Sequence, residues 1–359
     1  MIGVRGGGRA AGHGPPRHGP PPDAFAVVMA TGILAVAAAV HGYRPLAPVL
    51  FDVAVAAFVV LLGWLAVGVL GGARRLAREA RSPDVVLRAF TFVAAATVLA
   101  SAVQPLFGGP DRAVELLAAA GFAAWLVLLP LAVRDVRAQR LRELREQVHG
   151  AWLLVSVATA GLATSAADLA VRLHTRALLA AAAVLWVLAV LLYLLVVALV
   201  VWRLASRPFT PAEVTPDSWV LMGALAISAL AGDHVQAGVA ALGAPAGAAA
   251  AAHGLTVGAQ VAAMAWIVPL LGAQVWTAGR IPGFLAYQGS WWAAVFPLGM
   301  FSAASAATAR TWPLPPLTTV SLVLFWDALA LWVAVAVGLL HRSARRLVGP
   351  GPAAPRDHR

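Results

Sequence analysis

The sequence has no cysteine, which excludes disulfides and thiol-based metal or redox sites. Charged residues are scarce, at 11% of the chain against about 25% in soluble domains, whereas 61% of the residues are hydrophobic. Lysine is absent, and all 26 basic residues are arginine, which together with the excess of alanine and glycine indicates coding bias rather than chemistry. Long apolar runs recur along the chain. The composition therefore predicts an all-α, polytopic membrane protein.

A formal net charge of +11 is also found in proteins that bind nucleic acid. Here the arginines lie in short connections between apolar runs, where they set the orientation of a membrane protein. We therefore expect the lipid bilayer, and no nucleic acid, as a partner.

The apolar runs predict ten membrane-spanning helices in one transmembrane domain at residues 22–341. Residues 1–21 and 342–359 are expected to be disordered cytoplasmic tails, and the first tail is rich in glycine, proline, arginine and histidine. A signal peptide is the alternative for the start, but the apolar run from Ala24 continues as a full span. The expected spans are 22–41, 47–71, 85–107, 112–133, 148–168, 173–203, 217–241, 246–277, 290–310 and 315–341.

Short and long connections alternate along the chain, which groups the spans into five helical hairpins. The arginines gather in the tails and around the longer connections, and the positive-inside rule therefore predicts that both termini lie in the cytoplasm, below the plasma membrane. The hairpins begin at a nearly even period, which predicts five similar units in a quasi-five-fold ring around a central pore. The arginines expected on the other side are Arg44, Arg112, Arg172, Arg176 and Arg310.

Serine and threonine are concentrated in the first helix of each hairpin, and the second and fourth spans contain neither. Lipid offers a hydroxyl group no hydrogen-bond partner, whereas a hydrated pore or a helix interface does. Five inner helices around a pore, surrounded by five more apolar helices, explain this distribution. Close helix packing without a pore is the alternative.

The ninth span, Ser290 to Arg310, is the candidate for the working part of the chain. Pro297 interrupts it, which frees the carbonyl group of Ala293 and bends the helix. In hydrocarbon such a defect survives only where protein or water satisfies the freed group. With Phe296 beside the kink and hydroxyl groups following it, the pattern favours a helix that faces an internal path. A kinked, packed helix with Phe296 in the core is the alternative.

The first span has Phe25 followed by Met29-Ala30-Thr31-Gly32-Ile33. It resembles the opening helix of the tellurite-resistance/dicarboxylate transporter family, which includes the plant slow-type anion channels and the fungal malate and sulfite permeases. Ala30 stands where the family has glycine. The ninth span, with Trp291-Trp292, Phe296-Pro297 and Gly299, is similar to the family helix that carries a pore-occluding phenylalanine before a proline. The resemblance covers residues 22 to 341.

The resemblance implies a homotrimer in which each subunit holds its own pore for small anions, namely C4-dicarboxylate, sulfite, or chloride and nitrate. It implies no cofactor. By position the gate is Phe296, with Phe301 as the second candidate. The fifth and seventh spans lack proline, so kinks there would have to come from Gly161, Gly223 or Gly232. The candidate pore-lining residues are Phe25, Thr31, Gly32, Thr97, Ser101, Thr159, Gly161, Ser228, Pro297 and Ser302; for Thr31, a hydroxyl bonded back to its own helix is the alternative.

Ionisable side chains inside the expected spans are candidates for proton coupling. Asp233 and His253 are equally far from the turn at Gly243 and could pair across the hairpin, with His234 beside them. A structural ion pair or a subunit-contact cluster is the alternative. Asp327, in the tenth span, is expected to bond to a neighbouring helix, with a coupling role as the alternative.

These features predict an anion channel or transporter gated by a phenylalanine, with a proton-coupled carrier using Asp233, His234 and His253 as the alternative. A membrane-embedded enzyme using the same cluster is disfavoured, because there is no metal-binding pattern such as His-Glu-x-x-His and no sizeable polar loop. We therefore assign no catalytic residue and no metal ligand. A structural or accessory membrane protein is the remaining possibility.

Overall fold

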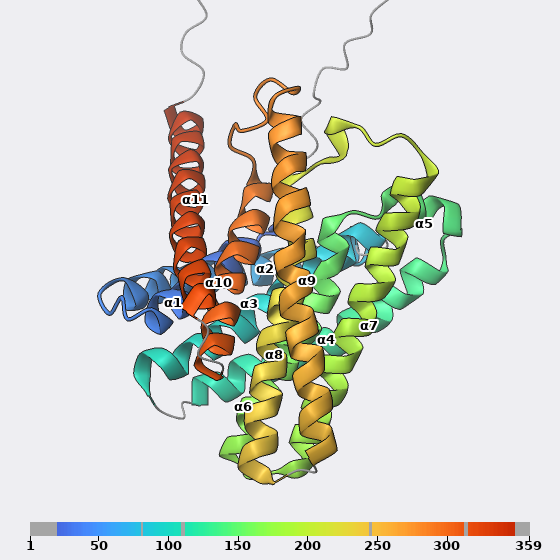
Figure 1. Cartoon of the computed structure of the whole chain (residues 1–359). Helices are drawn as coiled ribbons and strands as arrows, with labels where there is room; N and C mark the ends of the chain where they lie inside the picture. The colour runs from blue at the N-terminus through green and yellow to red at the C-terminus, as the bar shows by residue number, and fades with distance from the viewer. Residues whose placement is uncertain (1–19, 80–81, 109–111, 244–245, 312–314, 349–359) are drawn as a thin grey trace, which may run out of the picture.

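The computed structural model describes residues 20–79, 82–108, 112–243, 246–311 and 315–348, and within these ranges the chain forms helices and no strands (Figure 1). This confirms the all-α class. The α-helices are α1 (Ala26–Val40), α2 (Leu46–Glu79), α3 (Pro83–Phe107), α4 (Arg112–Arg137), α5 (Leu141–Gln147), α6 (Leu154–Arg172), α7 (Arg176–Ser206), α8 (Val220–Leu242), α9 (Ala246–Ala278), α10 (Trp292–Thr311) and α11 (Pro315–Val348). Short 3-10 turns are η1 (Gly150–Leu153), η2 (Pro211–Glu213), η3 (Pro216–Trp219) and η4 (Gly289–Trp291).

Within the described residues, nine helical segments are long and apolar enough to cross a membrane, and they correspond to the second through tenth expected spans. The first expected span is represented by α1, which is apolar but has only 15 residues. The chain ahead of α1 forms turns instead of helix, with the Ala24 N–H donating to the Pro21 carbonyl and the Ala26 N–H to the Asp23 carbonyl. Three consecutive prolines, Pro20 to Pro22, lack N–H donors and favour this irregular start.

Three helices differ from the expected boundaries. The connection after the fourth span contains α5, which docks by burying Leu144 and by placing the Arg145 guanidinium 5.3 Å from the Trp202 ring centroid. Helix α2 continues past a non-helical residue, Gly72, to Glu79. Helix α11 continues to Val348, so residues 342–348, expected in the C-terminal tail, are helical. Almost all of the expected N-terminal tail lies outside the described residues.

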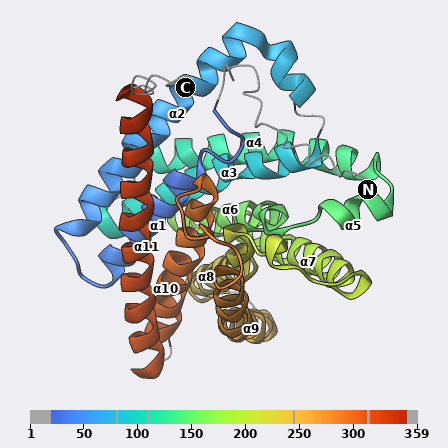
Figure 2. The same cartoon turned by 90° about the horizontal axis from the view of Figure 1, so that it is seen from above.

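Consecutive helices pack as hairpins, namely α1–α2, α3–α4, α6–α7, α8–α9 and α10–α11. The first helices of the hairpins also contact one another: α1 contacts α3 and α10, α6 contacts α3 and α8, and α8 contacts α10. In Figure 2, α10 lies between its hairpin partner α11 and its neighbour α8. Two of these first helices, α3 and α8, end at glycines in the left-handed backbone conformation, Gly108 and Gly243. This conformation suits the tight turn into the second helix of the hairpin.

Burial separates the two sets of helices. In the most apolar stretches of α3, α6, α8 and α10, with their adjoining turns, 72–83% of the residues are buried, and α1 is buried from Val28 to Ala38. In α2, α4, α7, α9 and α11 the corresponding share is 17–28%. The second set exposes large apolar side chains such as Leu70 and Val268, which suits contact with lipid. The helices richer in hydroxyl groups are therefore the buried ones.

Candidate functional site

A first cavity lies where the starts of the five buried helices converge. It is lined by residues from the start of α1, from α3, from η1 and α6, from η3 and α8, and from η4 and α10. Its volume is about 30 Å³, enough for a water molecule. Phe296 and Met29 form its apolar wall, while Arg88, Thr91 and Ser290 contribute polar groups. Phe296, the candidate gate, thus lies where all five of these helices meet.

A second cavity lies further along the same helices, by one helical turn on α1 and α10 and by about two turns on α6 and α8. Its volume is about 20 Å³, and α1, α3, α6, α8 and α10 all contribute to its wall. Ile33 and Met300, which line it, follow Met29 and Phe296 by one turn of α1 and α10. The expected lining residues Thr97, Ser101 and Gly161 all belong to this cavity. Two small cavities therefore follow one another between the five helices, with Phe296 in the wall of the first.

Phe296 is 1% exposed, so its ring is sealed among protein atoms. The next residue, Pro297, packs directly against Gly223 in α8, where an added Cβ would lie 2.9 Å from the proline ring. Pro297 has no N–H, so the carbonyl group of Ala293 loses its helical partner, and Ala293 lines the first cavity. The proline that the sequence predicts to interrupt this helix thus lies beside the cavity wall, and the carbonyl group it frees belongs to a lining residue.

A third and larger cavity of about 340 Å³ opens beside the first. Its wall includes Glu146, Arg203 and Glu213, and it shares Arg88, Asp217 and Ser290 with the first cavity. Arg203 donates to the Val148 carbonyl and lies 3.8 Å from Glu213, which fixes the side of the cavity formed by α7 and η2. The shared residues make the larger cavity a vestibule in front of the first one.

Arg88 stands at the junction of the vestibule and the first cavity, held by an ion network. Its Nε lies 3.1 and 3.0 Å from the two carboxylate oxygens of Asp84, and its Nη1 lies 3.1 Å from Asp23 Oδ2. Its Nη2 lies 2.8 Å from His149 Nε2, and Nδ1 of that imidazole lies 2.9 Å from the Gln147 carbonyl oxygen. Because a carbonyl oxygen can only accept, Nδ1 of His149 carries the proton and Nε2 accepts from Arg88.

Asp217 extends the network from the start of α8. Its Oδ2 accepts the Ala151 N–H at 3.1 Å and lies 3.6 Å from His149 Nε2, while Thr215 donates its hydroxyl to Oδ1. The carboxylates of Asp23, Asp84 and Asp217 therefore gather around a single guanidinium group.

The sequence prediction did not include this network, although a repeated signal marks it. A Pro-Asp pair lies at or just before the start of the first, third and seventh expected spans, at residues 22–23, 83–84 and 216–217. Proline is tolerated at a helix start, and a carboxylate there is stabilised by the helix dipole. His149 and Ser290 hold the corresponding places ahead of α6 and α10. Because the first helices of the five hairpins run in the same direction, these equivalent positions lie together at one end of the five helices, beside the vestibule.

Several other expected lining residues do not belong to either small cavity. Phe25 packs against Phe58 and Phe92, with ring centroids 5.7 and 5.2 Å away. Thr31 donates to the Val27 carbonyl at 2.8 Å and accepts from Trp332 Nε1 of α11 at 2.8 Å. The self-bonded alternative for Thr31 therefore describes its hydroxyl.

Other expected lining hydroxyls also bind backbone carbonyls or the second helices of the hairpins. Thr159 accepts from Trp125 Nε1 of α4 at 2.9 Å, and Ser302 donates to the Ser321 carbonyl of α11 at 2.7 Å. Ser228 donates to the Ala224 carbonyl at 2.8 Å. Gly32 packs against α3, because an added Cβ would lie 3.0 Å from Val98. Phe301 is fully buried but lines neither small cavity.

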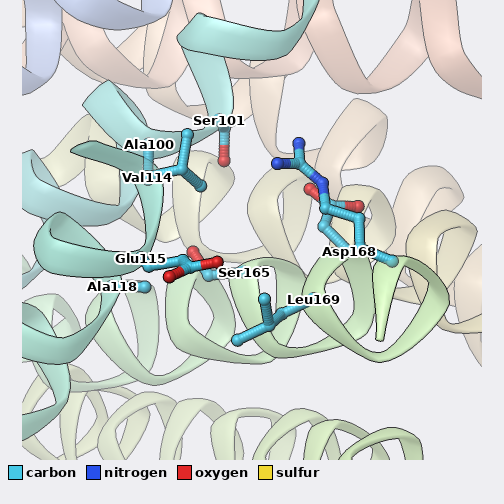
Figure 3. Close-up of a pocket in the computed structure, with 9 residues that line it drawn as sticks. Ala100, Ser101, Val114, Glu115, Ala118, Ser165, Asp168 and Leu169 are labelled. Atoms are coloured by element: carbon cyan, nitrogen blue, oxygen red, sulfur yellow. The ribbon is translucent and has the colours of Figure 1, made fainter. Parts of the chain in front are cut away.

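At the opposite ends of the helices, a cavity of about 10 Å³ lies between α3, α4 and α6 (Figure 3). Ser101, Glu115, Ser165 and Asp168 line it, and Ser101 also lines the second cavity. Asp168 lies 2.5 Å from His234 Nδ1. The structure thus brings an acid and a histidine of different hairpins together near the far end of the five helices.

The remaining intramembrane polar residues have separate partners. Asp233 accepts the Thr308 hydroxyl at 2.9 Å, and His253 Nδ1 lies 3.3 Å from Gln236 Oε1. Besides these hydrogen bonds, Asp233 interacts electrostatically with both His234 and His253, the residue considered as its partner across the hairpin. Asp327 is exposed on the surface of α11 in the isolated chain, so the expected bond to a neighbouring helix of the same chain is not supported.

Comparison with known proteins adds two findings. A family model described as voltage-dependent anion channel matches residues 20–340. An uncharacterized membrane protein of Mycobacterium tuberculosis, strain CDC 1551 / Oshkosh, is 38% identical over 148 residues, which is 40% of this chain and 72% of the relative. Its counterpart in strain ATCC 25618 / H37Rv has the same identity and coverage.

Proposed function

Because the chain belongs to the voltage-dependent anion channel family, we propose that it passes small anions through a pore inside each subunit, closed by Phe296. The proposed pore runs between α1, α3, α6, α8 and α10, arranged as a quasi-five-fold ring in this proposal. The observation that carries the proposal is the position of Phe296, whose ring is 1% exposed and lines a cavity shared by all five helices.

The proposed gate works by excluding water. A hydrated ion is far larger than cavities of about 30 and 20 Å³. To pass, it would have to lose hydration water beside Phe296, Met29 and Leu154, whose apolar side chains cannot replace the lost interactions with water. Rotation of the Phe296 ring into another position joins the two cavities. In the proposed path, the polar side chains that line the first cavity are those of Arg88, Thr91, Ser290, Asp23 and Asp217, and Arg88 is the cation among them.

Anion flux into proteoliposomes, compared between wild type and Phe296→Ala, tests the proposal. We expect the variant to pass chloride, nitrate, sulfite and malate faster than wild type, and potassium at the wild-type rate. Phe301→Ala is the matched control, because Phe301 is equally buried on the same helix but lines neither small cavity. An unchanged flux for every anion, or an equal rise with Phe301→Ala, would remove Phe296 from the gate. The same panel ranks the candidate substrates.

A proton-coupled carrier is the second candidate, favoured by the contact between His234 and Asp168. Asp168 lines a cavity that shares Ser101 with the second cavity of the path, so a proton held by this pair is close to the proposed pore. An inward pH gradient should then drive anion uptake in wild type and fail to do so in His234→Gln. Uptake that is indifferent to the gradient in both proteins points to a passive channel.

We also propose that three copies assemble in the plasma membrane with both termini in the cytoplasm. Asp327 supports assembly, because a carboxylate on an apolar membrane-facing surface is costly unless another protein surface covers it. The mass of the detergent-solubilised protein, measured by light scattering, tests the trimer. A monomeric mass that persists across mild detergents contradicts it.

A further inference from the structure

The junction occupied by Arg88 carries an inference that rests on the proposed function and extends it to substrate class. Arg88, Asp217 and Ser290 are the residues common to the vestibule and the first cavity, and Arg88 is the cation among them. An anion that moves from the vestibule toward Phe296 therefore passes the guanidinium group. Each of its three nitrogens already has a protein partner, Asp84 on Nε, Asp23 on Nη1 and His149 on Nη2.

Those acceptors show which ligand shape the site takes. Arg88 Nε meets both oxygens of Asp84, and Nη1 meets one oxygen of Asp23. A guanidinium group is a planar fork of donors that matches planar oxyanions, which accept two parallel hydrogen bonds, better than it matches a spherical halide. The protein's own carboxylates thus occupy a carboxylate-shaped site.

The two carboxylates are not held equally. Asp84 lies four residues before Arg88 on the same helix, so its contact is local. Asp23 comes from the turn ahead of α1 and contacts Arg88 through one oxygen, whereas Asp84 contacts it through both. The two carboxylate side chains are equally exposed, at 38%. A partly exposed ion pair held through one oxygen contributes little to stability, so Asp23 can leave at a smaller cost than Asp84.

We propose that Arg88 is a recognition site for planar oxyanions, that is carboxylates and nitrate, and that Asp23 is its internal competitor. The entering anion replaces the Asp23 carboxylate on Nη1 of Arg88 while Asp84 keeps Nε. The Asp23–Arg88 pair therefore acts as an ionic latch in front of the Phe296 gate and favours oxyanions over chloride.

The first test measures flux in the Phe296→Ala background, with nitrate, formate and chloride as probes. Adding Asp23→Asn removes the competitor, and the half-saturation concentration for nitrate and formate is expected to fall by about 2–5-fold, with a smaller change for chloride. Adding Arg88→Lys keeps the charge but removes the fork, and the preference for nitrate over chloride is expected to fall by roughly 3–10-fold. Glu143→Gln is the matched control, because Glu143 is an exposed acid of α5 that lines none of the three cavities.

The second test does not depend on conduction. Nitrate and formate should raise the melting temperature of the solubilised wild type more than chloride does, because a ligand bound to the folded state stabilises it. Asp23→Asn should show this rise at lower anion concentration, and Arg88→Lys should lose the difference between nitrate and chloride. The proposed oxyanion site is wrong if Asp23→Asn lowers the concentration needed for the rise in melting temperature as much for chloride as for nitrate. It is also wrong if the substitution changes that concentration for neither anion. If Phe296→Ala passes no anion while these binding shifts appear, the gate fails and the site stands.

Discussion

The α-carbon of Gly223 in α8 faces the ring of Pro297 in α10, so closely that a Cβ on residue 223 would lie 2.9 Å from two ring carbons and 3.0 Å from the Pro297 Cα. Neither the ring nor the backbone can move aside as a flexible side chain would. The contact therefore fixes the distance between α8 and α10 beside Phe296. Glycine at 223 is required by this close approach rather than by its backbone angles.

Gly223→Ala is accordingly expected to destabilise the protein by about 1–3 kcal/mol, because the added methyl group overpacks the contact with Pro297. The displaced α10 should also seal the path less well, so anion leak should rise above wild type but stay below Phe296→Ala. Thermal melting and proteoliposome flux measure the two effects. Gly258→Ala is the control, since an added Cβ there meets no atom within 4 Å. Equal melting temperatures for the two variants would contradict the packing argument.

The hydrogen bond between Thr31 and Trp332 gives a second prediction. Thr31→Val removes the acceptor and leaves a partly buried indole N–H without a partner, which is expected to cost about 1–3 kcal/mol. Trp332→Phe added to Thr31→Val removes the orphaned donor, so the double variant should lose less stability than the two single changes summed. Because this hydroxyl faces α11, anion selectivity in the Phe296→Ala background should stay unchanged. A change in anion selectivity caused by Thr31→Val would indicate instead that Thr31 lines the pore.

Met300 gives a third prediction, on the order of barriers along the path. It lines the second cavity, one turn beyond Phe296, where the volume is only about 20 Å³. Met300→Ala alone should leave flux at the wild-type level, because Phe296 still closes the first cavity, whereas Met300→Ala with Phe296→Ala should exceed Phe296→Ala alone. Met222→Ala is the matched control, since Met222 is fully buried but lines none of the cavities. If the double variant passes anions no faster than Phe296→Ala, the second cavity is not in series with the first.

A fourth prediction concerns pH and His41, the residue that follows α1. Its Nε2 lies 3.2 Å from Ser302 Oγ and 3.1 Å from Ser321 Oγ, and burial lowers the pKa of His41 below its usual value of 6.5, with Arg310 nearby acting in the same direction. Below about pH 6.5 the unfolded chain binds the proton more readily than the folded one. Stability should therefore fall as the pH drops below that value.

His41→Gln should weaken this fall, while His341→Gln, at an exposed histidine of α11, should leave it unchanged. Melting temperatures of the solubilised proteins between pH 7.5 and 5.5 (about one unit either side of the usual histidine value) provide the measurement. A wild type whose melting temperature rises on acidification contradicts the assigned direction.

The class of each helix could be predicted from the sequence more reliably than the direction of each side chain. Apolar runs located nine of the membrane-crossing segments, the family resemblance is confirmed by the match over residues 20–340, and hydroxyl content separated the buried helices from the exposed ones. A helix packed on every side has no polar face, so its pattern does not tell which hydroxyl meets a cavity. Thr97 lines one, whereas Thr31 and Thr159 accept from tryptophans of outer helices.

The network around Arg88 was harder to predict, because its members come from turns that meet only when all five hairpins are in place. Asp23 and Arg88 are 65 residues apart, and His149 follows Arg88 by 61. The positive-inside rule uses the charge of Arg88 to orient the chain, but it does not indicate that Arg88 lies where the five hairpins converge. The repeated Pro-Asp pairs mark this place, but only once the hairpins are known to share a direction.

The contact between α1 and the last hairpin bears on how the chain is made. Thr31 and Trp332 are 301 residues apart, so at roughly 5–20 residues per second the ribosome needs on the order of 15–60 s after releasing the first helix before its partner emerges. During that interval α1, only 15 residues long, lacks its partners α10 and α11. Nascent chains truncated before α10 should therefore hold α1 weakly, and insertion factors have the greatest opportunity to act on that intermediate.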